Sequence, residues 1–195
     1  LLTSSPWDEA DDESRACIEE LAGKLGALGA NVTEVRLDEE VQRLMELQRT
    51  ISGYEFKRSI AFERLRHFDS LSKILREGRL ADGVRVSASE YQAAIREVAS
   101  LRLRLADLFN DVDILLFPSA DGPAPAGIEA TGKPTFNSAW TVAGNPVITL
   151  PLFRSPRNGM PIGCQFIAGF ANDDMLISAT RKVMESMAPD TDRRA

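Results

Sequence analysis

Histidine and cysteine are scarce in this sequence, which contains one histidine and two cysteines among 195 residues. A single histidine, His67, argues against histidine-based catalytic triads and against metal sites made from several histidines. Cys17 and Cys164 are too few for a disulfide framework or a cysteine-based metal site. We therefore expect no metal ion. We expect both cysteines to be small buried residues with reduced thiols, which fits a cytoplasmic protein.

Long apolar runs and an excess of positive charge are also absent. No run approaches the roughly 18 apolar residues that a membrane-spanning helix requires, and the N-terminus lacks the regions of a signal peptide. The net charge of -6 argues against a role on nucleic acid or on a membrane surface, because both favour a basic face. The sequence begins with Leu1 instead of methionine, so we expect a processed chain or a piece of a longer protein.

Local catalytic motifs are missing as well. The sequence has no Gly-x-Ser-x-Gly nucleophile motif, no Walker loop and no Gly-x-Gly-x-x-Gly. Residues 70–73 match Ser-x-x-Lys, but the partner motifs Ser-Asp-Asn and Lys-Thr-Gly are absent, so a solvated helix surface is the favoured interpretation. His67 lies in a charged helical stretch, which favours a surface or structural role. The carboxylates cluster at helix starts and indicate no paired-carboxylate site.

The first 37 residues predict half of a parallel βαβ unit. Acidic residues 8–13 favour the start of a helix. Apolar residues then recur at helical spacing as far as Leu28, and Gly29 favours a helix end. Residues 31–37 carry valines at close spacing and are predicted to form a strand. The first strand of the unit would end in residues 1–2.

Helices are expected to occupy most of residues 38–110. One helical tract runs from about 38 to 67, and Glu55 lies on its apolar face as either a buried or, preferably, a solvated carboxylate. An apolar stripe is expected at Phe62, Leu65 and Phe68. Two glycines and several charges predict a loop over 76–86. Ser87 and Glu90 then match a capping box at the start of a helix that ends near residue 110.

The last part of the sequence predicts three strands and a closing helix. Apolar runs predict strands over 113–117, 147–150 and 162–168, and Asn158-Gly159 predicts a turn between the last two. Prolines and glycines exclude helix and strand over 119–134, and a loop of this length in a compact domain is usually functional or disordered. Asn172, Asp173 and Asp174 predict the start of the helix. The tail from Pro189 is expected to be polar and frayed.

Two aromatic residues and an asparagine follow the long loop. Phe136, Asn137 and Trp140 stand between this loop and a buried strand. Ligands in α/β proteins gather where loops leave the ends of strands. One interpretation places Phe136 and Trp140 in the core of a short helix. The other has them line a substrate funnel, with Asn137 as a polar contact.

Several short motifs resemble the C-terminal part of amidase-signature enzymes. In chain order they are Asp113-Ile-Leu-Leu-Phe-Pro118, Phe136-Asn137, Gly144-Asn-Pro146, Leu150-Pro151 and Gly159-Met-Pro-Ile-Gly-Cys-Gln165. The Asp-Asp-x-Leu at 173–176 is also similar to the start of the closing helix in that family. The resemblance is collinear over nearly the whole chain. It is strong from about 111 to 185 and weak between 38 and 86.

The resemblance implies a parent enzyme that hydrolyses amide or related C–N bonds. Such enzymes use a serine nucleophile, a second serine in a cis peptide and a lysine base, and they need no metal or other cofactor. In the family these residues lie in or before a Gly/Ser-rich signature, and this sequence contains no such run. Ser4-Ser5 is a poor match because Pro6 follows and the glycines are missing. We therefore assign no catalytic residue to the chain.

The resemblance does carry over the wall of the acyl pocket. It implies that a small-molecule amide substrate contacts Pro118, Ser119, Phe136, Asn137 and Trp140. Glutamine-using relatives, the A subunits of tRNA amidotransferases, carry an acidic residue just before the segment that matches Phe136-Asn137. This sequence has Pro134-Thr135 there. The difference argues against glutamine and favours an apolar or aromatic acyl group.

We expect an α/β fold with a mixed sheet flanked by helices, forming the C-terminal part of a single amidase-type domain. Its segments would be an αβ unit at 1–37, a helical segment at 38–110, and a strand, loop and strand core with a closing helix at 111–188. We expect the chain to be inactive without the N-terminal catalytic portion, and homodimerisation is compatible with the sequence. Two alternatives stay open. They are a non-catalytic module that binds a ligand or partner, and a structural subunit that completes an active site on another chain.

Overall fold

Three antiparallel strands form the centre of the fold. The computed structural model describes residues 1–128 and 131–187, so the predicted tail from Pro189 and residue 188 lie outside the described residues. The strands are β1 (Ile114–Pro118), β2 (Val147–Arg154) and β3 (Pro161–Ala168), and their order is β1-β3-β2. All three predicted strands are confirmed. Strand β3 is central, and six of its eight residues are buried.

The hairpin between β2 and β3 turns at the predicted Asn158-Gly159. Gly159 has a φ of 71°, in the left-handed region that favours glycine. The side-chain oxygen of Asn158 accepts a hydrogen bond from the amide of Met160 at 3.0 Å. A register shift between Leu150 and Phe153 lets β2 continue to Arg154. The predicted strand at 147–150 is therefore only the first half of β2.

A short parallel element adjoins the outer edge of β1. The Leu2 amide donates to the Leu116 carbonyl at 3.0 Å, and Leu2 forms an isolated parallel bridge with Val35. This bridge confirms the predicted parallel pairing of the two ends of the αβ unit. The predicted strand at 31–37 was too long, because most of these residues are exposed and only Val35 is paired in the structure. The parallel part of the predicted mixed sheet is thus a single bridge.

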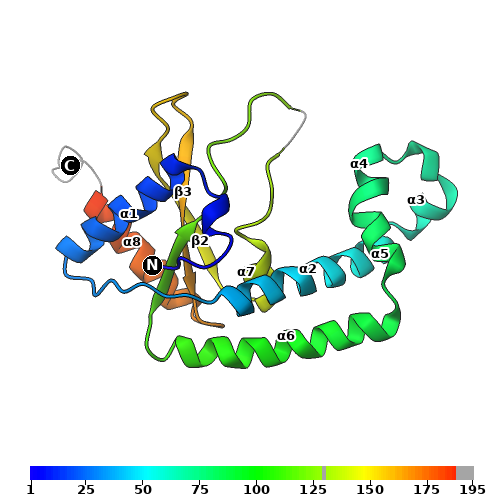
Figure 1. Ribbon diagram of the computed structural model, residues 1–195, viewed down its shortest axis with the longest axis horizontal. Coiled ribbons are helices and arrows are strands. Elements are labelled where there is room, and N and C mark those ends of the chain that lie inside the picture. The colour runs from blue at the N-terminus through cyan, green and yellow to red at the C-terminus, as the bar shows by residue number, and fades with distance from the viewer. Residues whose placement is uncertain (129–130, 188–195) are drawn as a thin grey trace.

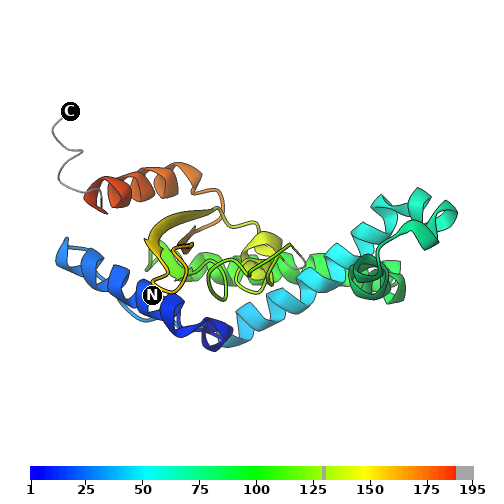
Figure 2. The same cartoon turned by 90° about the horizontal axis from the view of Figure 1, so that it is seen from above.

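Helices cover both faces of the sheet, as Figures 1 and 2 show. One face packs against α1 (Asp12–Ala27) and α8 (Asp173–Met187). The other face packs against α2 (Asp38–Ser59), α6 (Ala88–Leu108) and α7 (Ser138–Ala143). The α/β fold class is therefore confirmed. Successive strand residues point to opposite faces, so Phe166 joins the first apolar core and Ile167 the second.

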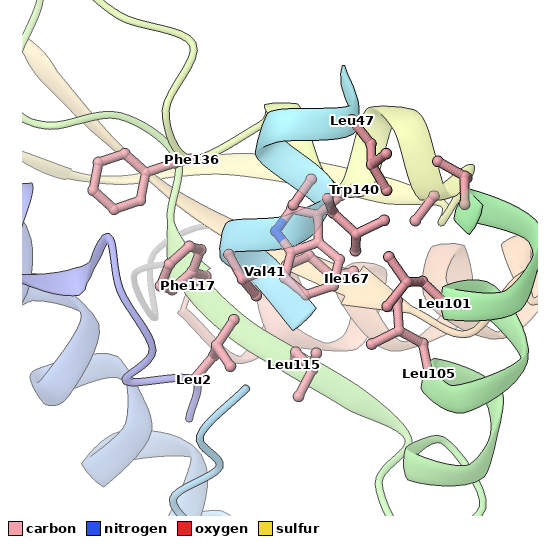
Figure 3. Packing of buried hydrophobic residues seen from close by; sticks show 14 of the residues in the cluster. Leu2, Val41, Leu47, Leu101, Leu105, Leu115, Phe117, Phe136, Trp140 and Ile167 are labelled. Atoms are coloured by element: carbon pink, nitrogen blue, oxygen red, sulfur yellow. The ribbon is translucent and has the colours of Figure 1, made fainter. Parts of the chain in front are cut away.

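Trp140 lies at the centre of the larger core (Figure 3). Its side chain from α7 packs among Val41 and Leu47 of α2 and Leu101 and Leu105 of α6. Only 1% of Trp140 is exposed. Because an indole buries a large apolar area, this single residue joins three helices and the sheet.

The two ends of α1 agree with the prediction, but the predicted burial of Cys17 within it does not. The Asp11 side chain accepts from the Ser14 amide at 2.8 Å and caps the helix. Gly29 has a φ of 97° just after the helix, as expected of a helix end. Cys164 is buried as predicted, but Cys17 is only half-buried, because the neighbouring Ile18 takes the position that faces the sheet.

The segment 61–85 forms a projecting helical arm (Figure 1). The arm comprises α3 (Ala61–Arg66), η2 (Phe68–Ser70), α4 (Lys73–Leu75), the π-helical turn η3 (Arg76–Leu80) and α5 (Ala81–Arg85). The predicted loop at 76–86 was therefore wrong for most of its length. The predicted stripe of Phe62, Leu65 and Phe68 is not in the core, since these side chains are exposed by 64%, 71% and 47%.

Two glycines attach the helical arm to α2. A Cβ atom on Gly83 would lie 1.9 Å from the carbonyl oxygen of Gly53, so the two backbones touch. The Arg49 guanidinium donates to both carboxylate oxygens of Asp82, at 2.8 and 3.0 Å, beside this crossing. The glycines that suggested a loop in the sequence thus permit close contact between helices.

The capping box and the helix after it are confirmed. The Ser87 hydroxyl accepts from the Glu90 amide at 3.2 Å, and the Glu90 carboxylate accepts from the Ser87 amide at 2.7 Å. Helix α6 then runs to Leu108, and the turn that follows places β1 in the sheet. Among the described residues, no helix is long and apolar enough to cross a membrane.

An arginine in the β2–β3 turn connects this hairpin to the start of α1. Arg157 contacts Asp11 and Glu13, each at 2.5 Å, and the Ser155 hydroxyl donates to Glu13 at 2.7 Å. Burial opposes ionisation of Asp11, but hydrogen bonds from Ser14 and Arg157 lower its pKa below the usual 3.8. Hydrogen bonds from Arg157 and Ser155 lower the pKa of Glu13 below 4.5.

Replacement of Gly83 by alanine should separate the helical arm from α2. An alanine in a helix gains roughly 0.5–1 kcal/mol over glycine, but overpacking against a backbone costs about 1–3 kcal/mol. We therefore expect Gly83→Ala to lower the free energy of unfolding in urea. Gly23→Ala in α1 is the matched control, because its Cβ would meet nothing within 4 Å. The control should be neutral or stabilising, and equal effects of the two variants would contradict the close crossing.

Removal of Arg157 should change how stability depends on pH. Depressed carboxylate pKa values stabilise the fold above the unfolded-state values and lose this effect as the pH falls through the folded-state values. Arg157→Ala should therefore be less stable than the unmodified chain at pH 7, and the difference should shrink as the pH falls below about 4. Urea titrations at pH 7 and pH 3 measure this difference. Arg96→Ala, an exposed arginine on α6, should show no such trend.

Candidate functional site

The two ends of the long loop meet beside the sheet. Ser119 directly follows β1, and its hydroxyl and amide both donate to the Gly163 carbonyl of β3, at 2.9 and 3.3 Å. Asn137 stands at the start of α7, and its side-chain amide donates to the Ser119 carbonyl at 3.1 Å. Two of the predicted site residues are therefore in direct contact, although 17 residues separate them in the sequence. This contact closes the loop.

Gly163 is the position on which Ser119 rests. A Cβ atom there would lie 2.3 Å from the Ser119 hydroxyl and 2.7 Å from a methyl group of Thr149. A side chain at this position would force the Ser119 or Thr149 side chain to shift, so glycine lets Ser119 lie directly against β3. The family-like motif 159–165 thus has a physical role at this residue.

Gln165 supports the other end of the loop from below. This residue of β3 is fully buried, and its side-chain amide donates to the Phe136 carbonyl at 3.0 Å. The Phe136 ring packs against Phe117 of β1 with centroids 5.2 Å apart (Figure 3). Our reading of the sequence assigned no role to Gln165. The signal available there was a polar residue in the middle of an apolar strand.

Two buried polar atoms next to this site have no hydrogen-bond partner within the described residues. They are the side-chain oxygen of Gln165 and the indole nitrogen of Trp140. Leaving a buried polar atom unpaired costs about 1–3 kcal/mol. Phe136 and Trp140 are each exposed by 1%, so both lie in the core of this chain, as does Pro118. Their predicted contact with a substrate stays a prediction.

Two cavities flank the loop and α7. One, of about 550 Å³, lies beside loop residues 121–126 and is rimmed by Asp11 and Arg157. The other, of about 350 Å³, lies between α2, α6 and α7 and includes Glu55 and Arg102. None of the five predicted site residues lines either cavity. Glu55 is exposed, which confirms the preferred prediction of a solvated carboxylate, and it accepts from the Tyr91 hydroxyl at 2.9 Å.

The remaining candidate groups have structural surroundings. Ser70 and Lys73 of the Ser-x-x-Lys match are both exposed, and the Lys73 ammonium lies 3.9 Å from the Glu77 carboxylate. His67 is exposed, and its ring lies 5.3 Å from that of Phe62. Burial raises the pKa of Cys164 to about 12, so its thiol stays protonated and is a poor nucleophile. Across residues 1–128 and 131–187, no group of His, Cys, Asp and Glu could hold a metal ion.

A family profile described as Amidase matches residues 1–177. The chain belongs to the amidase family, and the resemblance seen in its motifs is confirmed.

Individual relatives agree with this assignment. The putative amidase AmiD of Mycobacterium tuberculosis is 36% identical over 107 residues, which cover 50% of this chain and 22% of that protein. Human fatty-acid amide hydrolase 2 is 32% identical over 106 residues, which cover 52% of this chain and 20% of that protein. A solved structure described as an amidase has a TM-score of 0.78 and 25% identity, covering 96% of this chain and 46% of its own. The chain thus spans about a fifth of these curated relatives.

Replacement of Gly163 by alanine should displace Ser119 and open the loop. We expect Gly163→Ala to cost about 1–3 kcal/mol of unfolding free energy from overpacking, measured by urea titration with tryptophan fluorescence. Ser119→Ala should cost about 1 kcal/mol for the lost hydrogen bond. Because the second change removes the atom that clashes, the double variant should be more stable than the sum of the single effects predicts. Strict additivity would contradict the contact.

Proposed function

We propose that this chain forms the C-terminal part of an amidase that hydrolyses a carboxamide or a related C–N bond. It supplies part of the sheet and one wall of the substrate pocket, and it does not catalyse hydrolysis alone. One observation carries the proposal. The family match extends over residues 1–177, yet the sequence contains no Gly/Ser-rich run that could supply the serine nucleophile of such enzymes.

The surroundings of the chain's own hydroxyl and thiol groups support inactivity. The Ser119 hydroxyl donates to the Gly163 carbonyl, whereas a nucleophilic serine must give its proton to a base. No lysine or histidine of the described chain is recorded as its partner. The Cys164 thiol is protonated because burial raises its pKa to about 12. These surroundings support a nucleophile and base that are supplied from elsewhere in the parent enzyme.

The wall itself is the junction of Pro118, Ser119 and Asn137, backed by Phe136 and Trp140. Ser119 and Asn137 are half-buried, so they are the two of this set that can still meet a ligand. Phe136 and Trp140 lie behind them and fix their positions by packing. Ser119 and Asn137 would therefore contact the substrate, and Phe136 and Trp140 would hold them in place.

The sequence gives one indication about the substrate, and it concerns the acyl group. Thr135 stands where glutamine-using relatives have an acidic residue, which favours an apolar or aromatic acyl group. The name of the human relative, fatty-acid amide hydrolase 2, is that of an enzyme for an apolar acyl group. We therefore propose an amide of an apolar or aromatic carboxylic acid as the substrate class.

The purified chain should release no ammonia from hexanamide or benzamide above the rate of buffer. A chimera in which this chain replaces the matching part of the Mycobacterium tuberculosis AmiD should hydrolyse them, because that protein would supply the missing groups. Circular dichroism checks that both proteins are folded. Ordinary enzyme turnover by the isolated chain would overturn the proposal.

The wall is tested separately in the same chimera. Asn137→Ala should lower kcat/KM about tenfold, which corresponds to about 1.4 kcal/mol of lost transition-state stabilisation. Arg96→Ala, on an exposed helix face, is the control and should leave kcat/KM unchanged. An active chimera that is insensitive to Asn137→Ala would contradict the wall assignment and leave the family assignment intact.

A further inference from the structure

The helical arm contains a cavity of its own, away from the loop and the sheet. Its volume is about 490 Å³, which is within the range of roughly 300–1,000 Å³ typical of small-molecule sites. The lining residues are Arg64, Phe68, Arg76, Leu80, Ala81, Val84 and Arg85. The set combines three guanidinium groups with an apolar floor and contains no acidic residue.

The three arginines are weakly neutralised. Arg64 has no recorded carboxylate partner in the described chain, and its half-buried side chain carries a buried Nε atom without an acceptor. Arg76 lies 4.0 Å from the fully exposed Asp69, which is a weak contact. Arg85 forms no ion pair with any other described residue, and the nearby Asp82 is paired with Arg49. Positive charge at this cavity is therefore available to a ligand.

The local charge contrasts with that of the whole chain. The helical arm has six arginines and lysines against four acidic residues, whereas the complete sequence has 23 against 29. Such a separation attracts a small anion to the arm, since the excess of negative charge lies elsewhere. The excess of negative charge on the complete chain disfavours docking on an anionic membrane, because an extended negative surface also repels the acidic residues outside the arm.

The apolar floor indicates the other half of the ligand. Leu80 is exposed by only 2% and closes the bottom, while Phe68 and Val84 are exposed by 47% and 55%. A hydrocarbon tail laid over these residues would remove apolar surface from water. An inorganic anion such as phosphate would leave that surface uncovered.

We propose that this cavity binds an organic carboxylate that carries an apolar tail. Guanidinium groups pair with carboxylates through two parallel hydrogen bonds. Rotation of the Arg64 side chain into the cavity would give its Nε atom the acceptor that it lacks. Arg76 and Arg85 add charge at the rim, and the tail covers Phe68 and Val84. The site is independent of the proposed hydrolysis and needs no catalytic group.

The test uses the complete 195-residue chain labelled with ¹⁵N and titrated with octanoate. Saturable shifts should appear in the amide signals of the helical arm and in the Arg64 Nε–H signal. Octylamine, which has the same tail and the opposite charge, should cause no saturable shift there. Inorganic phosphate should bind at least about tenfold more weakly than octanoate, because it leaves the apolar floor uncovered.

Two variants and a matched control assign the binding to the cavity. Arg64→Gln and Arg85→Gln should each weaken octanoate binding about tenfold, a typical effect of losing one charge-assisted pair. Arg66→Gln removes an arginine of the same arm that does not line the cavity, and it should change little. Because Arg85 is exposed, its variant keeps the test valid if Arg64→Gln fails to fold.

Three results of these titrations would overturn the proposal. They are no saturable octanoate binding at millimolar concentration, equal binding of octanoate and octylamine, and equal effects of Arg66→Gln and Arg85→Gln. Capture of the chain by vesicles of anionic phospholipid without binding of free octanoate would also overturn it. That outcome would assign the arm to a lipid surface.

Discussion

Strand β3 is covered on both of its faces, and the position of every other layer follows from that burial. Phe166 and Cys164 point toward α1 and α8, while Ile167 and Gln165 point toward α2, α6 and α7. Both neighbouring strands run antiparallel to β3. A strand buried on both faces must be apolar or have its polar groups satisfied within the protein. The two groups of helices therefore pack against the two sets of β3 side chains, one on each face of the sheet.

The site depends on the same strand through two residues that differ from its apolar neighbours. Gly163 has no side chain, so Ser119 can rest on its carbonyl. Gln165 holds the Phe136 carbonyl, which fixes the segment leading to Asn137. The two ends of a long, proline-rich loop are thus positioned by one strand.

Periodic apolar patterns and capping residues were sufficient to predict α6, the three strands and the closing helix. They failed in the helical arm, where Gly83 was taken as a loop residue although it contacts Gly53 of a distant helix. They also overestimated the strand at 31–37, because only tertiary contact decides which of its residues pair. For the site, the sequence predicted Ser119 and Asn137 as parts of one pocket wall, and the structure places the two in contact with each other, while their contact with a substrate stays a prediction. The core interpretation of Phe136 and Trp140 agrees with their burial, but the sequence could not reveal that Gln165 supports the loop.

The helical arm packs mainly on α2 and makes its closest contact at a pair of glycines. None of its exposed apolar residues contributes to either core of the sheet. Substitutions or changes of length in the arm therefore leave the register of β1, β2 and β3 untouched. The arm thus lies apart from both cores, whereas α2, on which it packs, contributes Val41, Leu44 and Leu47 to the larger core. The fold separates the residues that order the sheet from those that line the cavity of the arm.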